Sequence, residues 1–147
     1  ALEIEGVTRA WVYPLEGGPG TVVIRFVCDN SSDILPTAEM IKKVQAYIDS
    51  VRPVTANVTV SAPTIQAIPF TISGLDPNND TVKAAVKASL ETLFRQEGGP
   101  GAVIYLSHIR AAISAAVGET DHTLVTPAGN IALGNKILPT VGEITWQ

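Results

Sequence analysis

The sequence has 147 residues, of which 46% are hydrophobic and 16% charged, and its net charge is −4 at neutral pH. A chain of this length can bury one sizeable core or two small ones without disulfides, and the single Cys28 excludes an internal disulfide scaffold. The acidic balance and the lack of a Lys/Arg cluster argue against a nucleic-acid partner. No apolar run is long enough to span a bilayer, so we expect no membrane partner.

The ends and the surface carry two further indications. The chain begins at Ala1, without an initiator Met or the features of a signal peptide, and we therefore expect a fragment of a longer protein. The charged fraction lies below the usual value of roughly a quarter. A neutral surface is typical of a subunit in a permanent assembly, but an ordinary domain with few lysines would have the same composition.

The first predicted element is an antiparallel hairpin over residues 8–27. Two runs of β-branched and aromatic residues, TRAWVYP and TVVIRFV, are separated by the glycine-rich tip LEGGPG at residues 15–20. The tip is too long for a two-residue turn and poor in groups that would fix it internally. We expect it to protrude and to be mobile.

A helix and a strand are predicted next. Thr37 is a candidate N-cap, and an apolar stripe follows at helical spacing and stops before Arg52-Pro53. Strict alternation of apolar and polar residues from Val54 to Ala62 then predicts a strand. The stripe consists of Ile41, Val44, Ile48 and Val51.

A second series of elements begins after a connector at residues 62–69, where Pro63 and Pro69 limit ladder pairing. It comprises a strand near residues 68–72, a helix over 81–97, a helix from about Ser107, and strands at 122–127 and 142–146. The residues expected to be buried on the two helices are Val82, Val86, Leu90, Leu93, Phe94, Ile109, Ala112, Ile113, Ala116 and Val117. Gly118 is expected to end the second helix in the left-handed conformation.

This order predicts an α+β fold with two small modules. Residues 1–62 form a ββαβ module and residues 63–147 a βααββ module, each with helices packed on a short mixed or antiparallel sheet. A single continuous mixed sheet remains an alternative.

Residues capable of catalysis are few. Cys28, His108 and His122 belong to no nucleophile or metal motif, and both GGPG strings lack the residues that accompany phosphate-binding loops. The acidic and amide residues at 76–80 lack the glycine and the later Glu of a calcium loop, so helix capping accounts for them. We expect no catalytic residue, no bound metal and no cofactor.

Large aromatic side chains are the other candidates for function. Trp11, Tyr13 and Trp146 belong either to the core or to a surface that anchors a partner, and for Trp11 and Tyr13 the core is the simpler interpretation. Together with the tip they form the candidate interface, which consists of Trp11, Tyr13, Leu15, Glu16, Gly17, Gly18, Pro19, Gly20 and Trp146.

Several segments, in order, resemble the baseplate J-like family of Mu-type contractile-tailed phages. They are GVTRAWVYPLEGGPGTVVIRFV, YIDSVRPVTANVTVSAP, YLSHIRAAISAAVGETDHTLVTPAGNI and the closing LPTVGEITW. The matching positions include Arg52 to Ala56, Ser107, Ile109, Ala112, Ile113, Gly118 and Asp121.

The resemblance implies a structural role rather than catalysis. Members are wedge proteins of the tail baseplate, and they are longer than this chain, which would correspond to their carboxyl-terminal part. Implied partners are other wedge and hub proteins in a six-fold hetero-oligomeric assembly, with the fragment alone a monomer. The implied location is the virion tail, after synthesis in the host cytoplasm. The competing hypothesis is a small-ligand-binding or regulatory α+β module, or an enzyme domain, which a concave pocket with convergent polar groups would favour.

Overall fold

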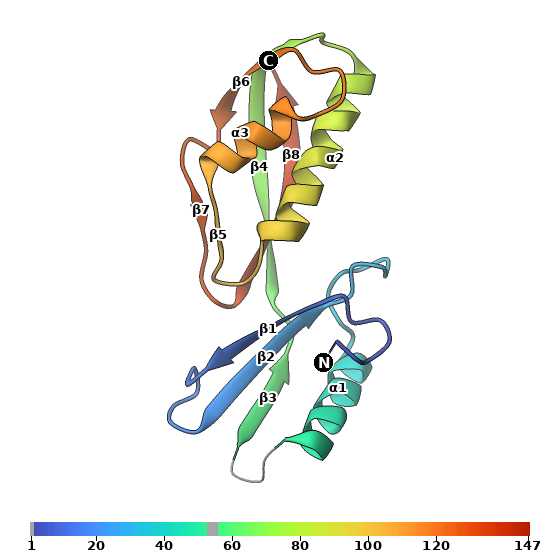
Figure 1. Cartoon of the computed structure of the whole chain (residues 1–147), viewed down its shortest axis with the longest axis vertical. Coiled ribbons are helices and arrows are strands. Elements are labelled where there is room, and N and C mark those ends of the chain that lie inside the picture. Colours follow the sequence, from blue (N-terminus) through green and yellow to red (C-terminus); the bar gives the residue numbers. More distant parts are fainter. Residues whose placement is uncertain (1, 53–55) are drawn as a thin grey trace. The chain divides into compact units, whose positions relative to one another are not determined.

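The computed structural model describes residues 2–52 and 56–147, and the chain divides into two units. Unit 1 is Ala1–Pro63 and unit 2 is Thr64–Gln147. Each unit combines short β-sheets with one or two helices, so the predicted α+β class is confirmed (Figure 1). None of the helices in the described ranges is long and apolar enough to cross a membrane.

Unit 1 has the predicted order of two strands, a helix and a strand. Strand β1 (Arg9–Pro14) pairs antiparallel with β2 (Thr21–Val27), and β3 (Asn57–Ser61) pairs parallel with β2. Helix α1 (Ala38–Val51) makes the crossover between β2 and β3. Val54, where the sequence predicted that the last strand begins, lies outside the described residues.

One face of this sheet packs against α1. The Thr37 side chain accepts a hydrogen bond from the Met40 N–H at 3.2 Å, which confirms the predicted N-cap. Val44 is fully buried against Phe26 and Val60, with Ile41, Ile48 and Val58 partly buried around them. Val51 is 61% exposed, so its predicted place in the apolar stripe is wrong, because the last turn of α1 extends beyond the sheet surface that the stripe covers.

Unit 2 is built around one long central strand. Strand β4 (Thr64–Asp76) pairs antiparallel with β6 (Asp121–Thr126) and parallel with β8 (Ile137–Trp146). The predicted connector is therefore mostly strand. Pro69 does not interrupt it, because the register between β4 and β8 shifts between Ile68 and Phe70 and accommodates a residue without an N–H. Two short strands, β5 (Val103–Ile104) and β7 (Ile131–Ala132), pair separately and were not predicted.

Helices α2 (Asp80–Glu97) and α3 (Leu106–Ser114) lie on the same side of β4 (Figure 1). Asn79 caps α2 by accepting a hydrogen bond from the Val82 N–H at 2.9 Å, which supports the capping interpretation of this segment. The predicted helix residues, apart from Val117 and the partly buried Ala112, are buried against alternate β4 residues, among them Ile68, Phe70 and Ile72.

The end of α3 differs from the prediction. Gly118 has the expected left-handed conformation, with φ +88°, but it does not end the helix, because α3 ends at Ser114 and its C-cap is Ala115. Val117, however, is 83% exposed, because α3 ends at Ser114 and the helical spacing no longer applies beyond it.

Candidate functional site

The face of the unit 1 sheet opposite α1 carries a row of cations and aromatic rings. Arg9, Trp11 and Tyr13 alternate along β1 and therefore share this face, and Arg25 lies directly across from Trp11 in the register. The Arg9 guanidinium lies 5.4 Å from the centre of the Trp11 ring, and the Arg25 guanidinium lies 4.9 Å from that of Tyr13. Both distances are within the range of cation–π attraction.

Each of these guanidinium groups is also held by a carboxylate. Arg25, only 4% exposed, donates two hydrogen bonds to Glu16 at 2.6 and 2.7 Å. Arg9 donates two to Asp29, both at 2.8 Å. Hydrogen bonding to the Glu16 carboxylate raises the pKa of Arg25, and burial raises the pKa of Tyr13 despite the nearby Arg25. Each of the two aromatic rings therefore lies against a guanidinium group that a carboxylate holds in place.

The hairpin tip is tied by several hydrogen bonds, so the expectation that it lacks fixing groups is wrong. The Leu15 N–H donates to the Thr21 carbonyl at 2.8 Å, and the Thr21 hydroxyl donates to the Gly18 carbonyl at 2.7 Å. Leu15, Gly18 and Gly20 adopt positive φ values of 64°, 111° and 77°. The predicted mobility of the tip stays a prediction.

The remaining candidate aromatic residue lies in unit 2. Trp146 is half-buried near the end of β8, with the Lys83 Nζ 5.7 Å from the centre of its ring. Trp11 and Tyr13 are also half-buried, so neither core nor exposed anchor describes them fully. The sequence analysis missed Arg25, which pairs with Glu16 of the tip. The one sequence signal was a lone arginine in the apolar run TVVIRFV, which fits an exposed face as well as a buried partner.

The residues considered for catalysis are engaged in local contacts. Cys28 is buried, and this burial, with the nearby Asp29 carboxylate, raises the pKa of its thiol. His108 pairs through Nδ1 with Glu97 at 2.9 Å, and His122 pairs with Glu119 at 3.0 Å. Within the described ranges no cluster of three or more His, Cys, Asp or Glu side chains could hold a metal ion.

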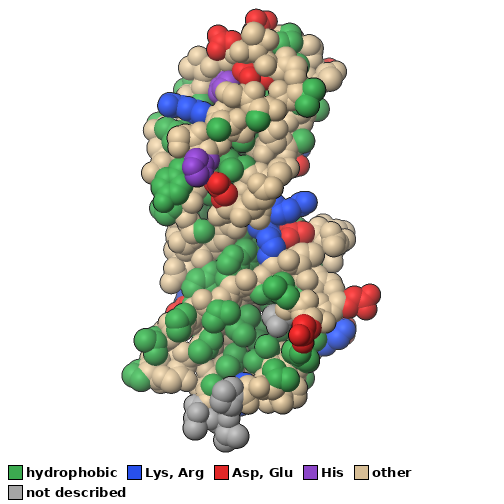
Figure 2. Space-filling view, viewed as in Figure 1, with side chains coloured by type: hydrophobic (Ala, Val, Ile, Leu, Met, Phe, Trp, Pro, Cys, Tyr) green, Lys and Arg blue, Asp and Glu red, His purple; other side chains and the backbone are tan. Residues whose placement is uncertain are grey.

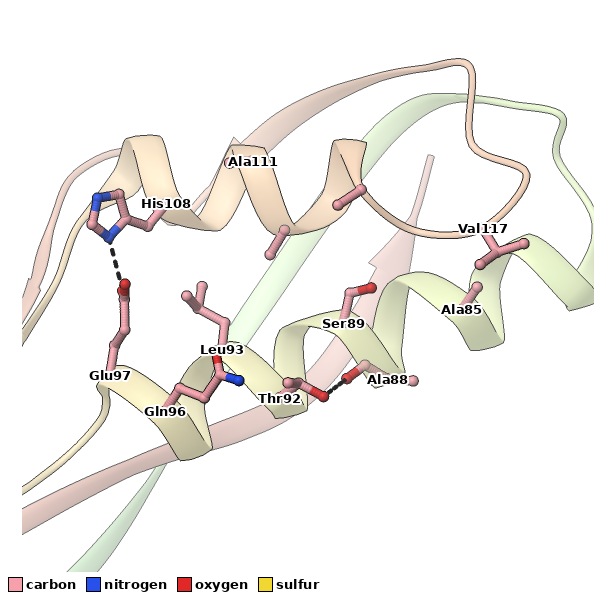
Figure 3. Close-up of a pocket in the computed structure, with 12 residues that line it drawn as sticks. Ala85, Ala88, Ser89, Thr92, Leu93, Gln96, Glu97, His108, Ala111 and Val117 are labelled. Atoms are coloured by element: carbon pink, nitrogen blue, oxygen red, sulfur yellow. Dashed lines mark hydrogen bonds and ion pairs between the residues drawn. The ribbon is translucent and has the colours of Figure 1, made fainter.

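A groove of unit 2 lies between α2 and α3 and has a volume of about 630 Å³. Figure 3 shows Ser89 and Leu93 pointing from α2 towards α3, with the His108–Glu97 pair at one end. Alanines make up much of the remaining lining, and the Thr92 hydroxyl donates to the Ala88 carbonyl. The groove is open and mainly apolar, so it lacks the convergent polar groups expected of a small-ligand site.

Exposed apolar side chains are spread over unit 1. Figure 2 shows hydrophobic side chains gathered over β1 and β2 with few charged groups between them. Among the described residues, Val12 and Leu15 are 61% and 65% exposed. Apolar surface of this kind favours a protein partner over a small ligand.

Two family models match the sequence. The model for the Baseplate J-like central domain matches residues 1–62, and the model for the Baseplate J-like protein C-terminal domain matches residues 67–147.

Curated relatives match nearly the whole chain. Mu-like prophage FluMu protein gp47 of Haemophilus influenzae is 38% identical over 99% of this chain and 43% of its own length. Baseplate protein gp47 of Escherichia phage Mu is 33% identical over 99% of this chain and 43% of its own length. Putative protein JayE of Escherichia coli is 30% identical over 99% of the chain and 56% of its own length. The chain therefore spans about half the length of these relatives.

Proposed function

Since this chain belongs to the baseplate J-like family, we propose that it is a structural component of the contractile-tail baseplate of a phage or prophage, and that it acts through protein contacts. The observation that carries the proposal is the 33% identity to the phage Mu baseplate protein over 99% of the chain. The low charged fraction of 16% supports it, because neutral surface is typical of subunits in permanent assemblies.

In this proposal the chain works by contact geometry, without catalysis. Its neighbours are the other wedge and hub proteins of a six-fold baseplate in the virion, and the protein is made in the host cytoplasm. Residues 1–62 and 63–147 act as two separate domains, each contributing its own contacts.

We place the contact surface of unit 1 on the hairpin. The rings of Trp11 and Tyr13 are pre-oriented by arginines, and the tip at residues 15–20 presents Leu15 with 65% of its surface exposed. Rigid aromatic groups lose little entropy when a partner covers them, which makes them effective anchors. Trp146 is the proposed anchor of unit 2.

The role is tested in the complete phage or prophage protein that contains this chain. Leu15→Asn removes the exposed apolar side chain, and Val117→Asn removes one that is 83% exposed at a site outside the proposed surface. We expect tails imaged by electron microscopy to lose baseplates in the first variant and to keep them in the second.

The proposal also predicts the protein composition of the same tails. Mass spectrometry of purified tails should detect the protein in stoichiometric amount. Its absence from intact tails would refute the baseplate role, whereas normal assembly of Leu15→Asn would refute only the contact at the tip.

A further inference from the structure

Strand β8 forms one edge of the unit 2 sheet, whose strand order is β6–β4–β8. Within the described part of the chain β4 is its one strand partner, so a row of backbone N–H and C=O groups on the other side has no ladder. Such a row can pair with a strand from another polypeptide. We infer that the carboxyl end of β8 docks an extended segment of a neighbouring protein that carries acidic side chains at alternate positions.

The outward-facing backbone groups at this end belong to Ile144 and Trp146. Gln147 donates its N–H to the Ile72 carbonyl at 2.9 Å and accepts from the Gly74 N–H at 3.2 Å, so Gln147 faces β4. Successive residues of a strand present their backbone groups to opposite sides. The backbone N–H and C=O groups of Trp146 therefore point to the open side of β8, as do those of Ile144 two residues earlier.

The first half of β8 is protected against such pairing. The Thr64 N–H donates to the Lys136 carbonyl at 2.7 Å, so the same alternation turns Pro139 outward, where it has no N–H to offer. Beyond it the register shifts opposite the Ile68–Phe70 segment, which interrupts the ladder. Prolines and bulges are the usual protections of an edge strand. Residues 144–146 have neither, which confines docking to this end.

A basic groove lies beside the open edge. Lys83 and Lys87 of α2 line it together with Ile144 and Trp146 of β8, and its volume is about 340 Å³. Neither lysine takes part in an ion pair among the described residues, and Glu143 is the one carboxylate in the lining. The groove therefore has an excess of positive charge that favours an acidic ligand.

The spacing of the two lysines fits a strand. Lys83 and Lys87 are four residues apart on α2, which runs alongside β8 (Figure 1), and this separation is about 6 Å along a helix axis. Alternate residues on one face of a strand are about 6.6 Å apart. A segment paired with Ile144 and Trp146 can thus direct two acidic side chains, at positions i and i+2, towards the two lysines.

A second copy of this chain is a poorer occupant. The sequence has two pairs of acidic residues at alternate positions, Glu3 with Glu5 and Glu119 with Asp121. Glu3 accepts a hydrogen bond from the Tyr47 hydroxyl, and Glu119 is buried in its pair with His122. One member of each pair is thus held within its own unit. The inference rests on the proposed function for the source of the segment, a neighbouring subunit of the assembly.

The experiment uses the 147-residue chain with Trp11→Phe, so that Trp146 is the single fluorescent tryptophan. The probe is a capped eight-residue peptide of alternating Glu and Val, and the comparison peptide has Lys in place of Glu. We expect the acidic peptide to change Trp146 fluorescence with saturation and to slow hydrogen exchange at the Ile144 and Trp146 amides. The basic peptide should do neither.

Charge variants distinguish binding at this groove from a general electrostatic attraction between the peptide and the protein. Lys83→Ala with Lys87→Ala should weaken binding of the acidic peptide about tenfold, since two exposed ion pairs are lost. The matched control, Lys42→Ala with Lys43→Ala, removes the same charge from α1 in unit 1 and should leave the affinity unchanged.

Three results would overturn the inference. They are no protection of the two amides, equal weakening by both double variants, or a dimer in sedimentation that the acidic peptide dissociates, which would identify a second copy as the occupant. Normal tails carrying the Lys83 and Lys87 changes would also count against this docking site, but would leave the proposed baseplate role intact.

Discussion

Removing the Glu16 carboxylate should destabilise unit 1 strongly, because it leaves the Arg25 guanidinium buried without its partner. Arg25 is 4% exposed and its two hydrogen bonds to Glu16 are short, at 2.6 and 2.7 Å. Breaking a fully buried ion pair by removing one partner costs about 3–5 kcal/mol. The Glu16 side chain is 20% exposed, so water can partly replace it, and we expect Glu16→Ala to cost about 2–3 kcal/mol.

The measurement needs a signal from unit 1 alone. With Trp146→Phe, the Trp11 fluorescence reports unfolding of unit 1 in urea, a denaturant that does not screen charges. Thermal unfolding should show the same loss. Because 1 kcal/mol shifts the melting temperature of a domain of 60–100 residues by about 4–8 °C, Glu16→Ala should lower the melting temperature of unit 1 by about 8–24 °C. Glu5→Ala, which removes one exposed negative charge elsewhere in unit 1, is the control and should have little effect.

A second substitution tests the cause. Arg25→Met combined with Glu16→Ala replaces the buried cation with an apolar side chain of similar length and should recover most of the lost stability. A loss below about 0.5 kcal/mol for Glu16→Ala, or a double variant less stable than Glu16→Ala alone, would refute the reasoning. The same argument applies to shortening the tip. Replacing residues 15–20 by Asn-Gly also removes Glu16, so the free energy of unfolding of unit 1 should fall.

Three further outcomes are expected. Burial raises the pKa of the Cys28 thiol above its ordinary value, so the neutral thiol stabilises unit 1 fully at pH values below the pKa of the unfolded chain. Urea titrations should show that this contribution is lost as the pH rises through the raised pKa, but not in Cys28→Ala. Gly142→Ala should unfold unit 2 at lower temperature in calorimetry, because the new Cβ would lie 2.8 Å from the Ile68 carbonyl oxygen. Ile113→Ala should cost about 2–5 kcal/mol in urea unfolding, while Val117→Ala changes the stability by less than about 0.5 kcal/mol.

The helices were predictable because apolar residues recur in them at regular helical spacing over several turns. Both cores were identified in advance from residues such as Val44 and Leu90, which are fully buried. Val51 and Val117 failed for different reasons. Periodicity says which residues would share a helix face, but it does not say where the surface covering that face ends, as for Val51, or where the helix itself ends, as for Val117. The two-residue strands β5 and β7 are too short for any alternation to be visible.

The geometry of the hairpin tip was less accessible from sequence. Gly and Pro in LEGGPG predict a loop, but which groups close it depends on a contact between Glu16 and Arg25, nine residues apart on opposite sides of the turn. An arginine among apolar residues indicates either an exposed face or a buried partner, and the sequence does not distinguish them. The edge position of β8 likewise follows from strand order, which local patterns do not encode.

Leu15 gives the strongest physical reason to regard the tip as a contact surface. It adopts φ +64°, a conformation that costs a branched side chain about 1 kcal/mol and that Asn tolerates well, and 65% of its surface is exposed. Neither the backbone conformation at this position nor the exposure of the side chain therefore favours leucine for folding. Leu15→Asn should raise the free energy of unfolding of unit 1 by about 0.5–1 kcal/mol in urea, by relieving strain. A destabilised variant would show that the leucine side chain serves the fold, and the argument for a partner at this position would fail.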